Sequence, residues 1–146
     1  MAELTRQREA MADLVLTAAL IIPSAAAEIA RGLSGATILR GNTLFKDTDN
    51  KMKLCDANGA SPLYKFAGIA LVDSSAGQPV LYVTKDPSLA LGTGSAGDIL
   101  ITSGANPGGI APHTDVAAGM FVTTLGVMTA NGVLNFAPST AKTVKA

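Results

Sequence analysis

The sequence predicts an all-β fold: a compact small β-barrel or sandwich of short antiparallel strands, with an N-terminal helix or arm. Eight to ten short runs rich in Thr, Val, Ile and Leu recur at spacings of about ten residues, with turn-forming residues between them. No long helical period follows residue 13. Short strands at this spacing are typical of small barrels and sandwiches.

The length and the composition favour one domain with a protein partner. A chain of 146 residues can bury about two-thirds of the surface that it exposes when unfolded. Eleven basic and eleven acidic residues cancel, and charged residues make up 15% of the chain, against roughly 25% in an average soluble domain. This argues against nucleic acid as a direct partner, since its backbone requires a basic face. A surface with so few charges favours a homo-oligomer.

Residues 1–13 are predicted to form an N-terminal arm or short helix ahead of a β-domain over 14–138 and a flexible tail over 139–146. A helix of about 12 residues is marginal without tertiary support. Leu4 and Met11 lie seven residues apart, and Arg6 and Arg8 add charge between them. These four side chains are the predicted contacts to a second subunit or to another partner.

The segment that follows has two interpretations. The apolar run Leu14–Ile22, the arginines before it and the small residues after it imitate a secretory signal peptide that is cleaved near Ala27. Acidic residues in the basic region and the shortness of the run weaken that interpretation, and a membrane span needs about 20 apolar residues. We favour two β segments, Leu14–Ile22 and Ala26–Arg31, joined at Pro23–Ser24.

Two hairpins are predicted in the middle of the chain. Thr43–Lys46 and Lys51–Cys55 flank the turn Asp47–Asn50, which lacks the ligand spacing of an EF-hand calcium loop. The segment Lys65–Thr84 contains a strand from Phe66, a turn at Asp73–Gln78 and a second strand that begins at or just after Pro79 and ends at Asp86–Pro87.

Two further pairs of strands are predicted in the second half. The first is Leu89–Thr102, with the loop Gly92–Gly97 between its strands; this loop lacks the Lys and the following helix of a phosphate-binding loop. After an irregular loop over 103–119, the alternating run Met120–Met128 leads through Asn131–Gly132, the strongest hairpin signal in the chain, into Val133–Phe136.

No enzyme, metal site or cofactor is predicted. Cys55 is the only cysteine, so an internal disulfide and a zinc cluster built on cysteines are excluded, and a buried thiol is the simplest interpretation. His113 lies near Asp115 in the proline-bounded loop, but no nucleophile elbow accompanies them. A small hydrolase built on this pair is the least favoured alternative.

Three stretches resemble the small capsid decoration, or cement, proteins of tailed bacteriophages. They are ATILRGNTLFKDTDNKMKLCDANGASP, FAGIALVDSSAGQPVLYVT and SGANPGGIAPHTDVAAGMFVTTLGV. The resemblance extends from Val15 to Phe136, and its most specific pieces lie at residues 67–80 and 107–127. Residues 1–13 depart from the pattern.

The resemblance implies a structural virion protein with no catalytic role. Such proteins are β-rich, commonly trimeric, and are made in the host cytoplasm. They sit on the outer surface of the expanded capsid, where they bind and stabilise the lattice of the major capsid protein, with no membrane and no cofactor. A trimeric β-module of a phage tail or fibre remains an alternative, as does an exported β-domain with a cleavable N-terminus.

Overall fold

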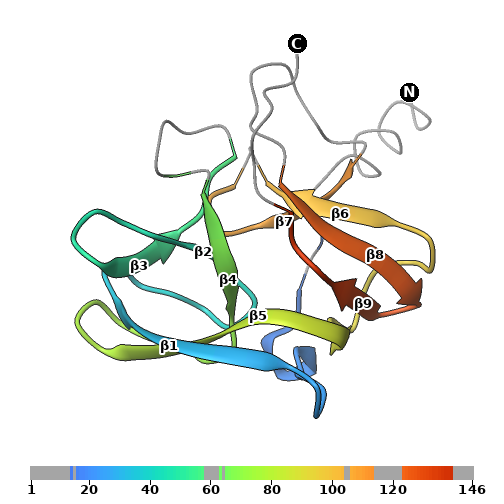
Figure 1. Cartoon of the computed structure of the whole chain (residues 1–146), viewed down its shortest axis with the longest axis horizontal. Coiled ribbons are helices and arrows are strands. Elements are labelled where there is room, and N and C mark those ends of the chain that lie inside the picture. Colours follow the sequence, from blue (N-terminus) through green and yellow to red (C-terminus); the bar gives the residue numbers. More distant parts are fainter. Residues whose placement is uncertain are drawn as a thin grey trace.

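The computed structural model describes residues 14, 16–57, 63, 65–103, 106–113 and 123–139. These residues form nine strands and one turn of 3₁₀ helix, η1 (Ala18–Leu20) (Figure 1). The strands are β1 (Glu28–Ser34), β2 (Thr43–Lys46), β3 (Lys51–Leu54), β4 (Phe66–Ala70), β5 (Pro79–Ala90), β6 (Ile99–Thr102), β7 (Ile110–Pro112), β8 (Thr124–Ala130) and β9 (Val133–Phe136). The predicted all-β class is confirmed.

Five strands close into a small barrel in the order β1-β3-β2-β4-β5, because β1 also pairs with β5. The long contact between β1 and β5 is antiparallel and runs from Glu28↔Lys85 to Leu33↔Pro79. The contact between β1 and β3 is parallel and covers only Leu33 and Ser34 of β1. The prediction of antiparallel pairing alone was therefore wrong at this one short contact.

A second sheet grows from the far half of β5, which pairs with β9, followed by β8, β6 and β7 (Figure 1). Strand β5 is twelve residues long and so belongs to both sheets. Its register with β9 shifts between Asp86 and Leu89, where a β-bulge or similar irregularity lies. Such an irregularity bends a strand, which allows β5 to leave one sheet and enter the other.

The core of the described residues has two main apolar clusters, a smaller and a larger one, beside a minor group of Ala57, Ile101 and Ala111. The smaller cluster contains Ile38, Leu44, Met52, Ala70 and Val80 of the barrel segment. The larger cluster joins barrel residues such as Val83 to residues of the second sheet such as Leu125, and Phe66 meets Phe136 edge to face at 5.7 Å between ring centroids. Burial of these apolar side chains is the main term that stabilises the fold, which needs no disulfide bond.

Three predicted hairpins are confirmed. β2 pairs with β3 around Asp47–Asn50, where Asn50 takes a left-handed φ of 65°. β4 pairs with β5, and β5 begins at Pro79 as predicted. β8 pairs with β9 around the Asn131–Gly132 turn.

The predicted strand Leu14–Ile22 was wrong. In its place the chain makes the turn η1, with the amide of Leu20 bonded to the carbonyl of Thr17 at 2.9 Å; among the described residues of this segment, Ile22 alone lies in a β-bridge, to Ala90. Ile21 is fully buried in the larger cluster. A short apolar run does not distinguish a strand from a segment that packs its side chains individually into a core.

Three other predictions of pairing were also wrong. β5 continues through Asp86–Pro87 to Ala90, because the irregularity accommodates a proline that cannot donate. The pair predicted within Leu89–Thr102 does not form: its first strand pairs with β9, while β6 pairs with β7 and β8. The loop predicted over 103–119 contains the strand β7.

The predicted arm, residues 1–13, lies outside the described residues, and so does the predicted tail from residue 140 to residue 146. At the start of the predicted tail, the Ser139 amide donates to the Thr124 carbonyl at 2.9 Å, and the Ser139 hydroxyl accepts from the Thr124 amide at 3.2 Å. This residue is therefore bonded to the first residue of β8.

A substitution at Gly126 tests the pairing of β8 with β9 in the second sheet. Its φ is +147°, and a Cβ at this position would overlap the backbone carbonyl of Asn135 on β9. Gly126→Ala is expected to lower the free energy of unfolding by at least about 3 kcal/mol, measured by urea denaturation. In the control Gly97→Ala, φ is also left-handed at +92° but the added Cβ meets nothing within 4 Å, so a loss of about 1–2 kcal/mol is expected. Equal losses in the two variants would contradict the predicted overlap.

Candidate interaction surface

Cys55 is a structural residue. Its side chain is fully buried, and burial, assisted by the neighbouring Asp56 carboxylate, raises its pKa to about 12. The thiolate is the nucleophilic form of cysteine and is therefore almost absent at neutral pH. The prediction of a buried thiol is confirmed.

The other residues considered for chemistry do not form a site within the described part of the chain. His113 is exposed directly after β7, and Asp115 lies outside the described residues. Among the residues that the structure describes, no group of three His, Cys, Asp or Glu side chains could hold a metal ion. The same part of the chain contains no helix that is long and apolar enough to cross a membrane.

The acidic turn between β2 and β3 is occupied by its own hairpin. Lys53 Nζ lies 2.7 Å from Asp47 Oδ2 and 3.3 Å from Asp49 Oδ2. The hydrogen bond from Lys53 and that from the Thr48 amide lower the pKa of Asp47. The pKa of Asp49 is also lowered, mainly by the Lys51 amide. The carboxylates therefore close the turn, as the hairpin interpretation predicted.

The glycine-rich loop Gly92–Gly97 is likewise bonded to its neighbours. The Gly97 amide donates to the Met128 carbonyl at 2.7 Å, and the Gly92 amide donates to the Gly132 carbonyl at 3.2 Å. Gly94 accepts from the Gly132 amide at 2.9 Å. The loop anchors the end of β5 to the β8–β9 hairpin, a structural role that does not require a phosphate.

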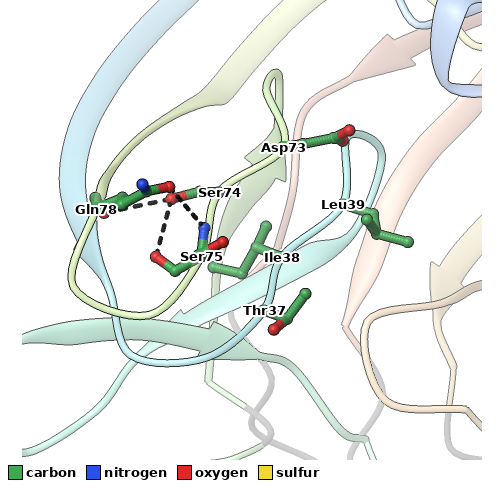
Figure 2. A pocket seen from close by; sticks show the side chains of 7 residues that line it. All are labelled: Thr37, Ile38, Leu39, Asp73, Ser74, Ser75 and Gln78. Carbon is green, nitrogen blue, oxygen red and sulfur yellow. Dashed lines mark hydrogen bonds between the residues drawn. The ribbon is translucent and has the colours of Figure 1, made fainter.

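A shallow hollow of about 340 Å³ lies at the turn before β5 (Figure 2). Its lining consists of Thr37, Ile38, Leu39, Asp73, Ser74, Ser75 and Gln78. The Ser34 hydroxyl donates to Ser74 Oγ at 2.6 Å, and Asp73 Oδ1 accepts from the Arg40 amide at 2.8 Å. In these hydrogen bonds, neither the Ser34 hydroxyl nor the Ser74 hydroxyl contacts a general base. The hollow is thus built from groups that close the turn, and its hydroxyls are not activated for nucleophilic attack.

Asp86 is a fully buried carboxylate at the irregularity of β5. It accepts hydrogen bonds from the Ser24 hydroxyl, from the Ser24 amide at 2.8 Å and from the Ser88 amide at 2.9 Å. Burial by itself would raise the pKa of Asp86, but these three bonds outweigh burial, so the pKa lies below its ordinary value. Asp86 therefore ties the segment before β1 to the strand that both sheets share.

Exposed aliphatic side chains concentrate along the border that precedes and includes β1. Of the eight large apolar side chains that are exposed in the described residues, four belong to this segment, and we call them the apolar flank: Leu20, Ile22, Ile29 and Leu33, with exposed fractions of 48%, 53%, 51% and 41%. They belong to one stretch of the chain, which runs antiparallel to β5 from the Ile22↔Ala90 bridge to Leu33↔Pro79. In Figure 1, β1 forms the lower border of the molecule. Single exposed aliphatic residues are ordinary, but a concentration of them indicates a binding surface.

The predicted contact residues Leu4, Arg6, Arg8 and Met11 all lie outside the described residues. The apolar flank was missed at the sequence level, where Leu20 and Ile22 were assigned to the β segment Leu14–Ile22. The available signal was the odd spacing of Ile29 and Leu33 around the charged Arg31, which places all three on one face of β1.

No protein-family model matches this chain, and no curated protein matches its sequence. Its function must therefore be inferred from its surface and from the resemblance described above.

The buried carboxylate gives a prediction about pH. The folded-state pKa of Asp86 lies below the unfolded value of about 3.9, so its stabilisation is present above that value and is lost as the pH falls through the folded-state pKa. Asp86→Asn is expected to lower the free energy of unfolding by about 1.5–3 kcal/mol at pH 7, because a neutral amide replaces the charged acceptor.

Urea denaturation at pH 7 and near pH 3 measures this effect. The difference between wild type and Asp86→Asn should shrink at the lower pH, because the unfolded state takes up protons near its ordinary pKa before the folded Asp86 does. Asp47→Asn, which removes an ion pair at the partly exposed β2–β3 turn, is the control and should have a smaller effect at pH 7. A difference that stays the same at both pH values would contradict the assigned role of the Asp86 charge.

Proposed function

We propose that this chain is a structural virion protein of a tailed bacteriophage. It binds the outside of the expanded capsid as a homo-oligomer and stabilises the lattice of the major capsid protein. No substrate, cofactor, membrane or direct contact with DNA is involved. The proposal combines the resemblance of three sequence stretches with the surface of the described domain.

The observation that carries the proposal is the apolar flank. Its side chains belong to a chain with only 15% charged residues, and the described groups with potential chemistry, apart from the exposed His113, are buried or bonded within turns. Burial of about 25 cal/mol for each Å² of apolar surface would favour binding to another protein surface. The flank therefore supports a binding function over a catalytic one.

Stabilisation follows from mass action. A ligand that binds only the mature lattice lowers the free energy of that lattice by about 2.7 kcal/mol for each site at a concentration of 100 times Kd. Many equivalent sites on a closed shell add these contributions, and linked subunits increase the total by multivalency. No covalent bond has to form or break.

The position of Ser24 argues against the exported alternative. Cleavage near Ala27 would remove Ile21, which is fully buried in the larger cluster, and Ser24, the partner of Asp86. We infer that the segment before Ala27 belongs to the mature protein. Leu4, Arg6, Arg8 and Met11 stay predicted contacts to the capsid or to a second subunit.

Substitutions in the flank test the proposal directly, with the full-length chain added to expanded capsids that do not contain this protein. Wild type is expected to cosediment with expanded capsids and to raise their temperature of disruption. Leu20→Ser combined with Ile22→Ser should weaken occupancy by at least about tenfold, because two exposed aliphatic contacts are lost.

Val127→Ser is the matched control, since Val127 is 43% exposed but lies on β8, outside the segment that carries the flank. Its occupancy should equal that of wild type. Absence of wild-type binding to expanded capsids would overturn the proposed function. Equal occupancy of the double variant and the control would exclude the flank from the contact.

A further inference from the structure

Strand β1 has an outer edge that the described part of the chain leaves unpaired over most of its length. One side of β1 pairs with β5 from Glu28 to Leu33. On the other side, β3 pairs only with Leu33 and Ser34. The edge from Glu28 to Gly32 lies at the lower border of the molecule in Figure 1. An open edge of this kind is a template for pairing with another strand.

The hydrogen bonds at the end of β1 show which backbone groups point outward. The Ser34 amide donates to the Gln78 carbonyl beside β5 at 2.8 Å, whereas the Gly35 amide donates to the Met52 carbonyl on β3 at 2.8 Å. Bonding direction alternates along a strand, so even-numbered residues of β1 face β5 and odd-numbered residues face outward. Ile29 and Arg31 therefore each present an N–H and a C=O group at the open edge.

Ile29 and Arg31 of one copy can pair with Arg31 and Ile29 of a second copy. In an antiparallel pair of identical strands, a two-fold axis at Ala30 places Ile29 of one copy opposite Arg31 of the other. Both outward N–H groups and both outward C=O groups of each copy then find partners, which gives four hydrogen bonds. Ile29, which is 51% exposed, is covered by the aliphatic stem of the opposing arginine.

The register with its axis at Ala30 is more favourable than the two neighbouring registers. An axis at Arg31 would place the two Arg31 side chains directly opposite each other, where like charges repel. An axis at Ile29 would place Arg31 opposite Ala27 and would leave the outward groups of Arg31 beyond the end of the partner's strand. With the axis at Ala30, the outward N–H and C=O groups of Ile29 and Arg31 are all paired, and no like charges face each other.

We propose that β1 is a self-association strand, and that two copies of this chain pair through β1 in antiparallel fashion about Ala30. The contact joins the barrels of two copies into one continuous sheet. It goes beyond binding to a capsid and does not require one. It is also separate from the three-fold assembly that the sequence resemblance implies, because an isologous contact relates two copies.

Arg31→Pro tests the contact in the full-length chain. Proline removes the outward N–H of residue 31 but no bond to β5, and proline is tolerated on a strand edge. By sedimentation equilibrium, wild type is expected to dimerise with increasing concentration, and Arg31→Pro should raise the dissociation constant at least about tenfold. Arg31→Ala keeps the N–H group and is expected to dimerise more strongly than Arg31→Pro. Wild type that stays monomeric, or variants with equal dissociation constants, would overturn the proposal.

A crosslink tests the register, and its outcome stands even if the proline variant fails to fold. Opposing residues of a pair without mutual hydrogen bonds lie about 4.5 Å apart between Cα atoms, within disulfide range. Oxidised Ala30→Cys should therefore yield a covalent dimer at least about tenfold faster than Arg31→Cys. The native Cys55 is buried and does not compete. Faster crosslinking of Arg31→Cys would overturn the assigned register.

The crosslinked and proline variants also separate this inference from the proposed function. An Arg31→Pro variant that no longer pairs through β1 but still binds expanded capsids would leave the proposed function intact and would restrict β1 to self-association. Wild type that dimerises through Ala30→Cys but binds no capsid would support the strand contact and contradict the proposed function.

Discussion

Strand β5 belongs to both sheets, so its twelve residues have to satisfy two sets of partners. The irregularity between Asp86 and Leu89 makes this possible, since it bends the strand at the point where its partner changes from β1 to β9. Asp86 is buried there and binds Ser24, so the same point also fixes the segment that enters β1. The barrel, the second sheet and the apolar flank all take their positions from this junction.

The junction explains why the apolar flank stays exposed along the border formed by β1. Where β5 pairs with β9, its apolar side chains are covered by the second sheet, as with Leu89. Where it pairs with β1, the second sheet does not extend over Ile29 and Leu33, and both stay exposed. A surface of this type costs solubility in a free monomer, and together with the low charge of the chain it is consistent with the proposed assembly.

The sequence predicted local pairing well and long-range pairing poorly. Asn131–Gly132 and Asp47–Asn50 identified their hairpins, because turn chemistry is encoded in a few adjacent residues. The continuation of β5 past Pro87 and the pairing of β6 with β8 depend on distant residues, and no local pattern specifies them. The candidate surface was partly visible in the spacing of Ile29 and Leu33, but its exposure depends on the second sheet.

The central claim, binding to the outside of an expanded capsid, is tested most directly by electron cryomicroscopy of expanded capsids incubated with the full-length chain. The proposed function predicts ordered additional density on the outer surface, absent from capsids without the chain, into which the five-stranded barrel fits. Capsids that show no additional density at saturating protein, or virions in which the chain is located only in the tail or a fibre, would contradict it.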